Sequence, residues 1–219
     1  MTSRPETLTA KGNRRRQALL RAAVDVIAEK GYAGVTHRAV ADQAGVPVAS
    51  TSYFFSSIHE LTREAAAQYQ AERHEQYLSL IELFAEERRS PAEGCELLVT
   101  VLLSVPTEWV LAHYEFYLNA GRVPELRPTV EASFDGFERV AEAALNAVGA
   151  RRPTEGARAL VAMVDGFMLR RLAMPSPDDA AVMEQAFREV FITYAMERDE
   201  LDQWMDRAEQ PADSALAPR

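Results

Sequence analysis

The chain has 219 residues, of which 47% are hydrophobic and 26% are charged, a balance typical of a globular protein that buries a sizeable core. Its one cysteine, Cys95, excludes an intrachain disulfide, and the longest uncharged apolar run, about 97–107, is too short to span a bilayer. The N-terminus is polar and lacks an apolar signal core, so we expect a cytoplasmic protein.

The net charge of −9 is distributed unevenly along the chain. Residues 1–60 carry 8 Lys or Arg and 5 Asp or Glu, a net charge of +3, which leaves −12 for residues 61–219. The first segment can therefore approach phosphate groups, whereas the second repels them. Opposite signs in two segments predict two parts with different tasks and a nucleic-acid partner for the first part.

Residues 1–12 are polar and are expected to form a disordered arm. A helix is expected over about 13–30 and opens with Arg14, Arg15 and Arg16. Three adjacent arginines allow two interpretations, a contact with phosphate or the minor groove, or a solvated helix start. Positive charge opposes the helix macrodipole at this end, which favours the contact with DNA.

Residues 36–54 have the pattern of two short helices joined by a tight turn. Thr36 is a suitable N-cap for a helix over about 36–44. Gly45 follows where a positive φ is wanted, and a second helix is expected over about 47–54. Two such helices about a glycine turn form a helix-turn-helix, whose second helix can lie in the major groove of DNA.

The remainder of the chain shows helical periodicity and no strand-like alternation. The expected fold is all-α, with a three-helix helix-turn-helix domain over 13–59 and a larger helical domain over 60–208, followed by a disordered tail at 209–219. Helices in the larger domain are expected at about 60–88, 93–105, 108–119, 126–148, 154–173 and 178–208.

No motif for a cofactor or a metal is present. The chain contains no Walker loop, no GxGxxG, no GxSxG, and no CxxC or HxxxH spacing, so we expect neither a cofactor nor a metal site. Cys95 lies early in an apolar helix with no histidine nearby in sequence. It is interpreted as a small core residue rather than a nucleophile.

An aromatic face on the helix at 108–119 is the main candidate for binding a small molecule. Four residues at i, i+4, i+7 and i+8 share that face: Trp109, His113, Phe116 and Tyr117. A pocket with apolar walls and a few polar groups is one interpretation, and a filled aromatic core is the other. Three further residues would complete either one: Phe134, Phe137 and Met168.

A carboxylate, Asp165, interrupts an apolar stripe on the helix at 154–173. A buried carboxylate is costly unless it is paired, so Asp165 either pairs with Arg170 or Arg171 or serves as an acid in the pocket. The last two helices carry matching apolar stripes, which indicate either a dimer interface or a core within one chain. Their residues are Leu160, Val164, Phe167, Phe187, Val190, Phe191 and Tyr194.

The helix-turn-helix is flanked by further recognisable residues on both sides. The combined set is Gly31-Tyr32, Thr36, Val40-Ala41, Ala44-Gly45-Val46, Tyr53, Phe55 and Leu61. This combination resembles the tetracycline-repressor-like (TetR-type) family of transcriptional regulators, closely over about 14–65 and elsewhere only by length and helical pattern. The sequence departs from the family at Ile58, where a Lys or Arg commonly contacts phosphate, and at Ser52 or Phe54, where a Tyr is common.

The resemblance implies a homodimer whose two helix-turn-helix units enter successive major grooves, about 34–36 Å apart. It also implies a ligand pocket in the body, between the helix expected at about 60–88 and the helices that follow it, and a dimer interface formed by the last two helices of each subunit. Expected DNA contacts are Arg14, Arg15, Arg16, Thr36, His37, Arg38, Val48, Ala49, Ser50, Thr51, Tyr53 and His59, with Ser50 and Thr51 reading base edges. Expected ligand contacts are Trp109, His113, Phe116, Tyr117, Phe134, Phe137, Asp165 and Met168.

We therefore expect a ligand-responsive repressor that binds a palindromic operator and is released by a small-molecule inducer. The inducer is expected to have an apolar or aromatic body and a polar group, neutral or cationic, although Arg122 and Arg127 leave room for an acyl thioester of coenzyme A. One alternative is an activator or architectural DNA-binding protein without a ligand. The other is an α-helical enzyme that uses His113 with Glu115 or Asp165, against which the absence of a cofactor motif counts.

Overall fold

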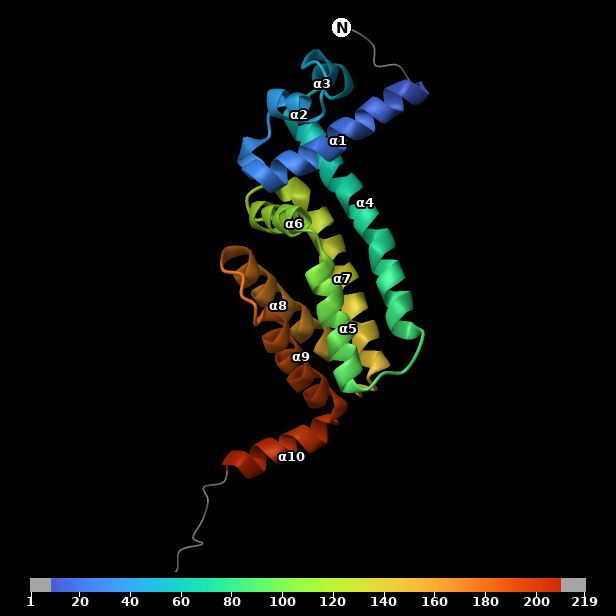
Figure 1. Ribbon diagram of the computed structural model, residues 1–219, viewed down its shortest axis with the longest axis vertical. Helices are drawn as coiled ribbons and strands as arrows, with labels where there is room; N and C mark the ends of the chain where they lie inside the picture. Colours follow the sequence, from blue (N-terminus) through green and yellow to red (C-terminus); the bar gives the residue numbers. More distant parts are fainter. Residues whose placement is uncertain (1–8, 210–219) are drawn as a thin grey trace, which may run out of the picture. The chain divides into compact units, whose positions relative to one another are not determined.

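The computed structural model describes the backbone of residues 9–209 and the side chains of residues 9–205. Figure 1 shows a chain built from helices, and no strand occurs in the described part, so the all-α prediction is confirmed. The elements are α1 (Ala10–Lys30), η1 (Tyr32–Gly34), α2 (His37–Gln43), α3 (Ala49–Phe54), α4 (Ile58–Ala85), α5 (Pro91–Ser104), α6 (Thr107–Ala120), η2 (Pro124–Leu126), α7 (Arg127–Ala147), α8 (Pro153–Ala173), α9 (Asp179–Ala195) and α10 (Arg198–Glu209).

The chain packs as two compact units. Unit 1 comprises the described residues up to Ser79 together with Ser104–Phe137, and unit 2 comprises Leu80–Leu103 together with the described residues from Glu138 onward. The helix-turn-helix therefore shares a unit with α6 and with the first part of α7. The domain boundary expected near residue 60 does not coincide with this division and stays a prediction.

Capping residues determine where the helices of unit 1 begin and end. Thr9 accepts a hydrogen bond from the Gly12 N–H at 3.1 Å, so α1 starts at Ala10, and residues 10–12 are helical rather than part of a disordered arm. The first eight residues lie outside the described part of the chain. Thr36 Oγ1 accepts from the Ala39 N–H at 3.0 Å, and Gly45 has φ +65°, as predicted for the helix-turn-helix.

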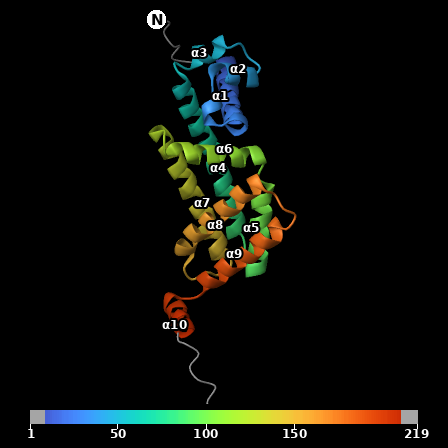
Figure 2. The same cartoon turned by 90° about the vertical axis from the view of Figure 1, so that its left-hand side faces the viewer.

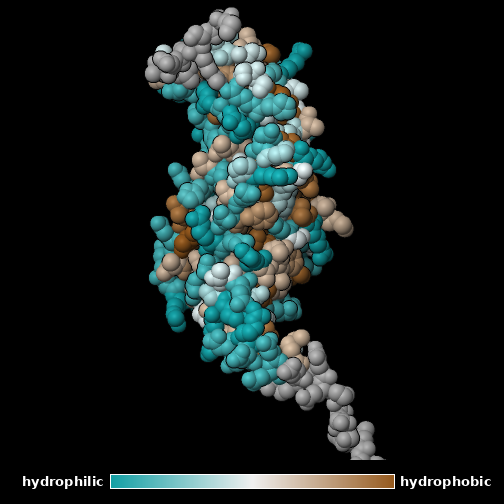
Figure 3. All heavy atoms as spheres, turned by 180° about the vertical axis from the view of Figure 1, so that it is seen from behind, coloured by the Kyte–Doolittle hydropathy of each residue, from teal (hydrophilic) through white to brown (hydrophobic). Residues whose placement is uncertain are grey.

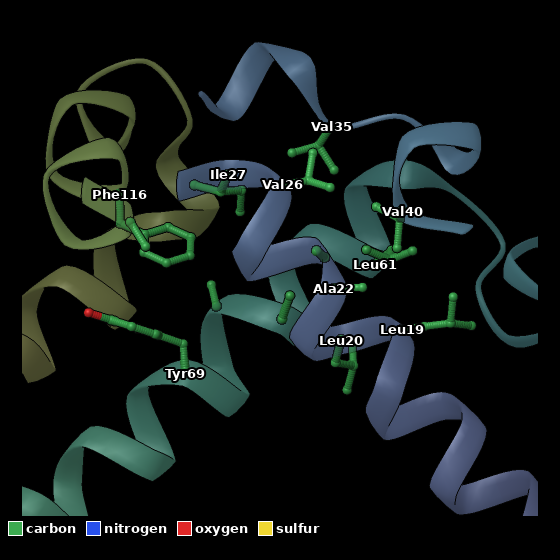
Figure 4. Close-up of a cluster of buried hydrophobic side chains, with 14 of the residues drawn as sticks. Leu19, Leu20, Ala22, Val26, Ile27, Val35, Val40, Leu61, Tyr69 and Phe116 are labelled. Atoms are coloured by element: carbon green, nitrogen blue, oxygen red, sulfur yellow. The ribbon is translucent and has the colours of Figure 1, made fainter. Parts of the chain in front are cut away.

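Unit 1 is built around α1, whose apolar residues recur at helical spacing. Figure 4 shows Leu20, Val26 and Ile27 of α1 among side chains from α4 and α6. Each fully buried leucine or isoleucine contributes about 1.5–3 kcal/mol. The same core takes in residues of the helix-turn-helix and of the later helices: Val35, Val40, Phe54, Phe55, Leu61, Tyr69, Phe116 and Leu126. The core of unit 1 therefore fixes the helix-turn-helix against α6.

In unit 2, α8 and α9 lie side by side (Figures 1 and 2). The single helix predicted over 178–208 is wrong, because the chain breaks at Met196 into α9 and α10. The side chain of Arg152 donates to the carbonyl oxygens of Thr193 at 3.1 Å and Met196 at 3.0 Å. The Arg152 N–H also donates to the Tyr194 carbonyl at 3.2 Å, so the last carbonyls of α9 are satisfied from outside the helix.

Some large apolar side chains remain at the surface, where hydrophobic atoms lie among hydrophilic ones (Figure 3). No single helix in the described part of the chain is long and apolar enough to cross a membrane. The consecutive helices α5 and α6 meet that criterion only as a bent pair taken together. No cluster of three or more His, Cys, Asp or Glu suited to a metal ion occurs among the described residues.

Candidate DNA-binding and ligand-binding sites

The exposed face of α3 differs in part from the predicted one. Val48 and Tyr53 are 42% and 59% exposed, and Ala49 is also exposed. Thr51 is fully buried; its hydroxyl donates to the Val48 carbonyl at 2.7 Å and lies 2.9 Å from His37 Nδ1. The prediction that Thr51 reads a base edge is therefore wrong, because this side chain connects α2 to α3. Ser50 is half-buried.

One exposed residue of α3 was not predicted as a DNA contact. Ser52 is exposed and lies three residues after Ala49 and one before Tyr53. Residues three and four positions apart share a helix face, so this spacing is the sequence signal that identifies Ser52. The exposed face of α3 is therefore formed by Val48, Ala49, Ser52 and Tyr53.

The three arginines at the start of α1 have different environments. Arg14 and Arg15 are exposed, as are Thr36, Arg38 and His59 near the helix-turn-helix. Arg16 forms an ion pair with Glu64, and its guanidinium lies 5.3 Å from the centre of the Phe55 ring. It therefore connects α1 to α4, contrary to the prediction that it contacts DNA.

Five rings from three helices of unit 1 form a cluster, called here the aromatic cluster: Tyr77, His113, Tyr117, Phe134 and Phe137. His113 lies 4.1 Å from Tyr117 and 5.1 Å from Phe137, measured between ring centres. Tyr117 stacks on Phe134 at 4.5 Å, and Tyr77 contacts Phe137 at 5.0 Å. The structure thus brings together four of the predicted ligand residues and adds Tyr77.

The other predicted ligand residues lie outside the aromatic cluster. Phe116 is 2% exposed and packs against Tyr69 in the core of unit 1, at 5.3 Å between ring centres. Trp109 contacts Arg73, whose guanidinium lies 3.8 Å from the centre of the indole ring. Asp165 and Met168 belong to unit 2, half-buried and buried respectively. Arg171, one of the two partners expected for Asp165, pairs with Asp179 at 3.9 Å.

A stripe of three buried residues on α4 was not predicted from the sequence. Tyr69, Arg73 and Tyr77 are buried and follow i, i+4, i+8 spacing, which is the signal that places them on one face. Burial raises the pKa of Tyr69 to about 12 and also raises that of Tyr77, so both phenols are protonated near neutral pH. α7 approaches this stripe at Gly136, where an added Cβ would lie 2.2 Å from the Tyr77 ring.

His113 is the polar centre of the aromatic cluster. It is 7% exposed, and its Nε2 has no hydrogen-bond partner among the described residues. Burial, and secondarily the charge of Arg73, lowers the pKa of His113 to about 4, so the imidazole is neutral at pH 7. A neutral imidazole can donate or accept at Nε2, depending on its tautomer. The imidazole therefore offers a buried polar atom, Nε2, to a guest that enters the aromatic cluster.

Most of the residues predicted for the dimer interface are buried within unit 2. Leu160, Phe187 and Phe191 are at most 1% exposed and Val190 is 8% exposed, so their assignment to the dimer surface is wrong. They form the core between α8 and α9, which was the alternative interpretation. The remaining three are half-buried: Val164, Phe167, which lies 5.9 Å from Phe187 between ring centres, and Tyr194. Cys95 is fully buried, as predicted, and burial raises its pKa to about 11.

A different apolar face of α8 and α9 is exposed. Leu169 and Val182 are each 47% exposed and Ile192 is 54% exposed. Two small residues of α8, Ala162 and Gly166, are exposed as well, and nothing lies within 4 Å of a Cβ added at Gly166. These five residues are called here the outer face of unit 2. It combines exposed aliphatic side chains with positions where a partner helix can approach closely.

Comparison with protein-family models matches residues 19–65 to "Bacterial regulatory proteins, tetR family" and residues 89–192 to "Tetracyclin repressor-like, C-terminal domain". Among solved structures, the chain is 31% identical to a TetR-family member from Streptomyces coelicolor, over 80% of this chain and 97% of that one, with a TM-score of 0.63. It is 30% identical to the multidrug binding protein EbrR complexed with ethidium, over 80% and 98%, with a TM-score of 0.60. For EbrR complexed with proflavin the identity is 31%, over 80% of this chain and 99% of that one, with a TM-score of 0.55. Curated protein sequences give no match.

The chain belongs to the TetR family of bacterial transcriptional regulators. The two family models cover its DNA-binding part and most of its helical body, which confirms the family predicted from residues 31–61.

Proposed function

We propose that the protein is a cytoplasmic, ligand-responsive repressor that binds a palindromic operator as a homodimer and is released by a small-molecule inducer. The exposed face of α3 supports the DNA contact, together with exposed Arg14, Arg15 and Arg38. Arginines at such positions neutralise phosphate, while the α3 side chains reach base edges in the major groove.

The observation that carries the inducer proposal is the unpartnered Nε2 of His113 inside the aromatic cluster. A buried polar atom without a partner is costly, and a ligand that supplies a hydrogen bond removes that cost. Arg73 carries a positive charge close enough to affect His113, which disfavours a cation at this position. We therefore propose a neutral aromatic inducer with a hydrogen-bonding group, although the relative EbrR forms complexes with the cationic dyes ethidium and proflavin.

α6 offers a route from the inducer site to the DNA-binding helices. His113 lies in the aromatic cluster, whereas Glu115, two residues later, accepts a hydrogen bond from the Tyr32 N–H at 2.8 Å in the turn between α1 and α2. Asn119 Nδ2 donates to the same Glu115 oxygen at 3.2 Å. An inducer that favours a shifted position of α6 would therefore move the carboxylate that holds this turn.

The same contacts weigh against the enzymatic alternative. Glu115 is engaged with Tyr32 and Asn119, so its carboxylate is occupied as a hydrogen-bond acceptor rather than placed as a base for His113. Titration of a preformed protein–DNA complex with candidate inducers distinguishes an inducible repressor from a regulator without a ligand.

Substitution of His113 by Phe is expected to weaken the inducer by roughly five-fold or more, about 1 kcal/mol, because it removes one buried hydrogen bond and keeps most of the bulk. A panel of neutral aromatic compounds is screened by thermal shift, and the strongest binder is titrated against a preformed protein–DNA complex. The control is His74→Phe, the same change at an exposed position of α4. Identical release curves for wild type and His113→Phe would show that His113 is only a packed core residue.

A further inference from the structure

A cavity of about 350 Å³ lies within unit 1 between α1 and α4, and Trp109 of α6 also lines it. It does not include any residue of the aromatic cluster. Leu20 and Val24 of α1 form an apolar wall, and Tyr69 of α4 adds an aromatic one; Leu20 and Tyr69 can be located in Figure 4. This volume is at the lower end of the range for small-molecule sites, so the cavity suits a guest with one ring or a short aliphatic body.

Arg73 lines this cavity and forms no ion pair among the described residues, although the charge of the neighbouring Glu72 acts on it. The side chain is 8% exposed, stacks on Trp109 at 3.8 Å and lies 5.7 Å from the centre of the Tyr69 ring. Within the described part of the chain it makes no hydrogen bond or ion pair with another residue. The planar guanidinium presents five N–H donors, which remain available to an acceptor placed in the cavity.

The two carboxylates that line the cavity are engaged with other side chains. Glu72 pairs with Arg21 at 3.6 Å and accepts a hydrogen bond from Gln68 Nε2 at 3.0 Å. Asp25 accepts from Gln43 Nε2 at 3.5 Å. Of the two arginines lining the cavity, Arg21 is paired with Glu72, and Arg73 is the one that forms no ion pair among the described residues.

The amide of Gln68 adds a second polar requirement. Its Nε2 donates to Glu72, whereas its Oε1 is buried and has no hydrogen-bond partner among the described residues. The cavity therefore presents an unused cationic donor on Arg73 and an unused acceptor on Gln68, five residues apart on α4, between apolar and aromatic walls.

We propose that this cavity binds a small carboxylate with an apolar body and a hydrogen-bond donor, distinct from the inducer proposed for the aromatic cluster. The carboxylate of the guest would accept a bidentate pair of hydrogen bonds from the guanidinium of Arg73. The hydrogen-bond donor of the guest would donate to Gln68 Oε1. The guest contacts both α1, which carries Arg14 and Arg15, and α4. It is therefore a second effector whose binding stabilises one arrangement of the DNA-binding helices.

The test uses the full-length protein with Trp204→Phe, which leaves Trp109 as the one tryptophan. Tryptophan fluorescence is titrated with 3-hydroxybenzoate, with benzoate, which lacks the hydroxyl donor, and with 3-hydroxybenzamide, which is uncharged. We expect saturable quenching by 3-hydroxybenzoate, and affinity weaker by about ten-fold or more for 3-hydroxybenzamide and for the Arg73→Met variant. Arg63→Met, an exposed arginine of α4 outside the cavity, serves as the control and is expected to bind as wild type.

Two further variants keep the test decisive if Arg73→Met does not fold. Gln68→Leu is expected to abolish the preference for 3-hydroxybenzoate over benzoate, and Arg73→Lys to retain part of the preference for carboxylate over amide. His113→Phe is expected to change 3-hydroxybenzoate affinity by less than about two-fold, which separates this site from the aromatic cluster. Equal affinity for carboxylate and amide, or no saturation up to on the order of 10 mM, would overturn the proposal.

Discussion

Replacing Ile192 by Arg is expected to convert the protein to a monomer and to weaken operator binding by roughly 100-fold or more, because two linked DNA-binding units gain that much from binding together. Ile192 is 54% exposed on α9, so the arginine is solvated in the isolated subunit and the fold is kept. In a dimer joined through the outer face of unit 2, the same charge would be buried without a partner.

Sedimentation velocity at micromolar protein and fluorescence anisotropy with operator DNA measure the two effects. Leu118→Arg is the matched control, since Leu118 is 64% exposed on α6 and belongs to unit 1. Phe187→Arg is expected to unfold the subunit instead, because Phe187 is fully buried between α8 and α9. An Ile192→Arg protein that sediments as a dimer would place the interface on another surface.

Tyr53→Ala is expected to lower operator affinity by roughly ten-fold or more, about 1.4 kcal/mol, while the thermal unfolding midpoint stays close to that of wild type. The ring is 59% exposed and packs edge-on against buried Phe54 at 4.9 Å between ring centres. This contact orients the phenol outward, so truncation removes a DNA contact and little of the core.

Two further variants show which interaction accounts for the loss of operator affinity in Tyr53→Ala. Tyr53→Phe retains the ring and removes the hydroxyl, so it separates a hydrogen bond to the DNA backbone from a packing contact. Thr51→Ala is expected to act through stability instead, because the buried Thr51 hydroxyl connects His37 to the Val48 carbonyl. Wild-type affinity in a folded, dimeric Tyr53→Ala protein would exclude the exposed face of α3 as the reading surface.

The helices could be predicted from the sequence because their signals are local. Thr36 and Gly45 are adjacent to the helix ends that they define, and the apolar stripe of α1 shows in its own periodicity. The break between α9 and α10 could not be predicted in this way. It depends on Arg152, which reaches the carbonyls of Thr193 and Met196 from more than forty residues earlier.

For the candidate sites, too, the local spacing of residues could be predicted, whereas their packing against other helices could not. Helical spacing identified His113 and Tyr117 on one face of α6, but the spacing alone did not show that Phe116 packs into the core of unit 1. Spacing also did not distinguish the two apolar faces of α9. The large aromatic residues Phe187 and Phe191 are buried, and the smaller aliphatic Ile192 remains outside, because inward and outward faces are decided by packing against other helices.

The central proposal, a dimeric repressor that recognises a palindrome, is tested most directly by selecting bound sequences from a library of random DNA duplexes with the purified wild-type protein. Two α3 helices related by a two-fold axis read two half-sites in successive major grooves, one helical turn or about 34–36 Å apart. The selected sequences are therefore expected to share an inverted repeat with that spacing. Enrichment of a single unpaired half-site, or of no sequence at all, would contradict the proposal.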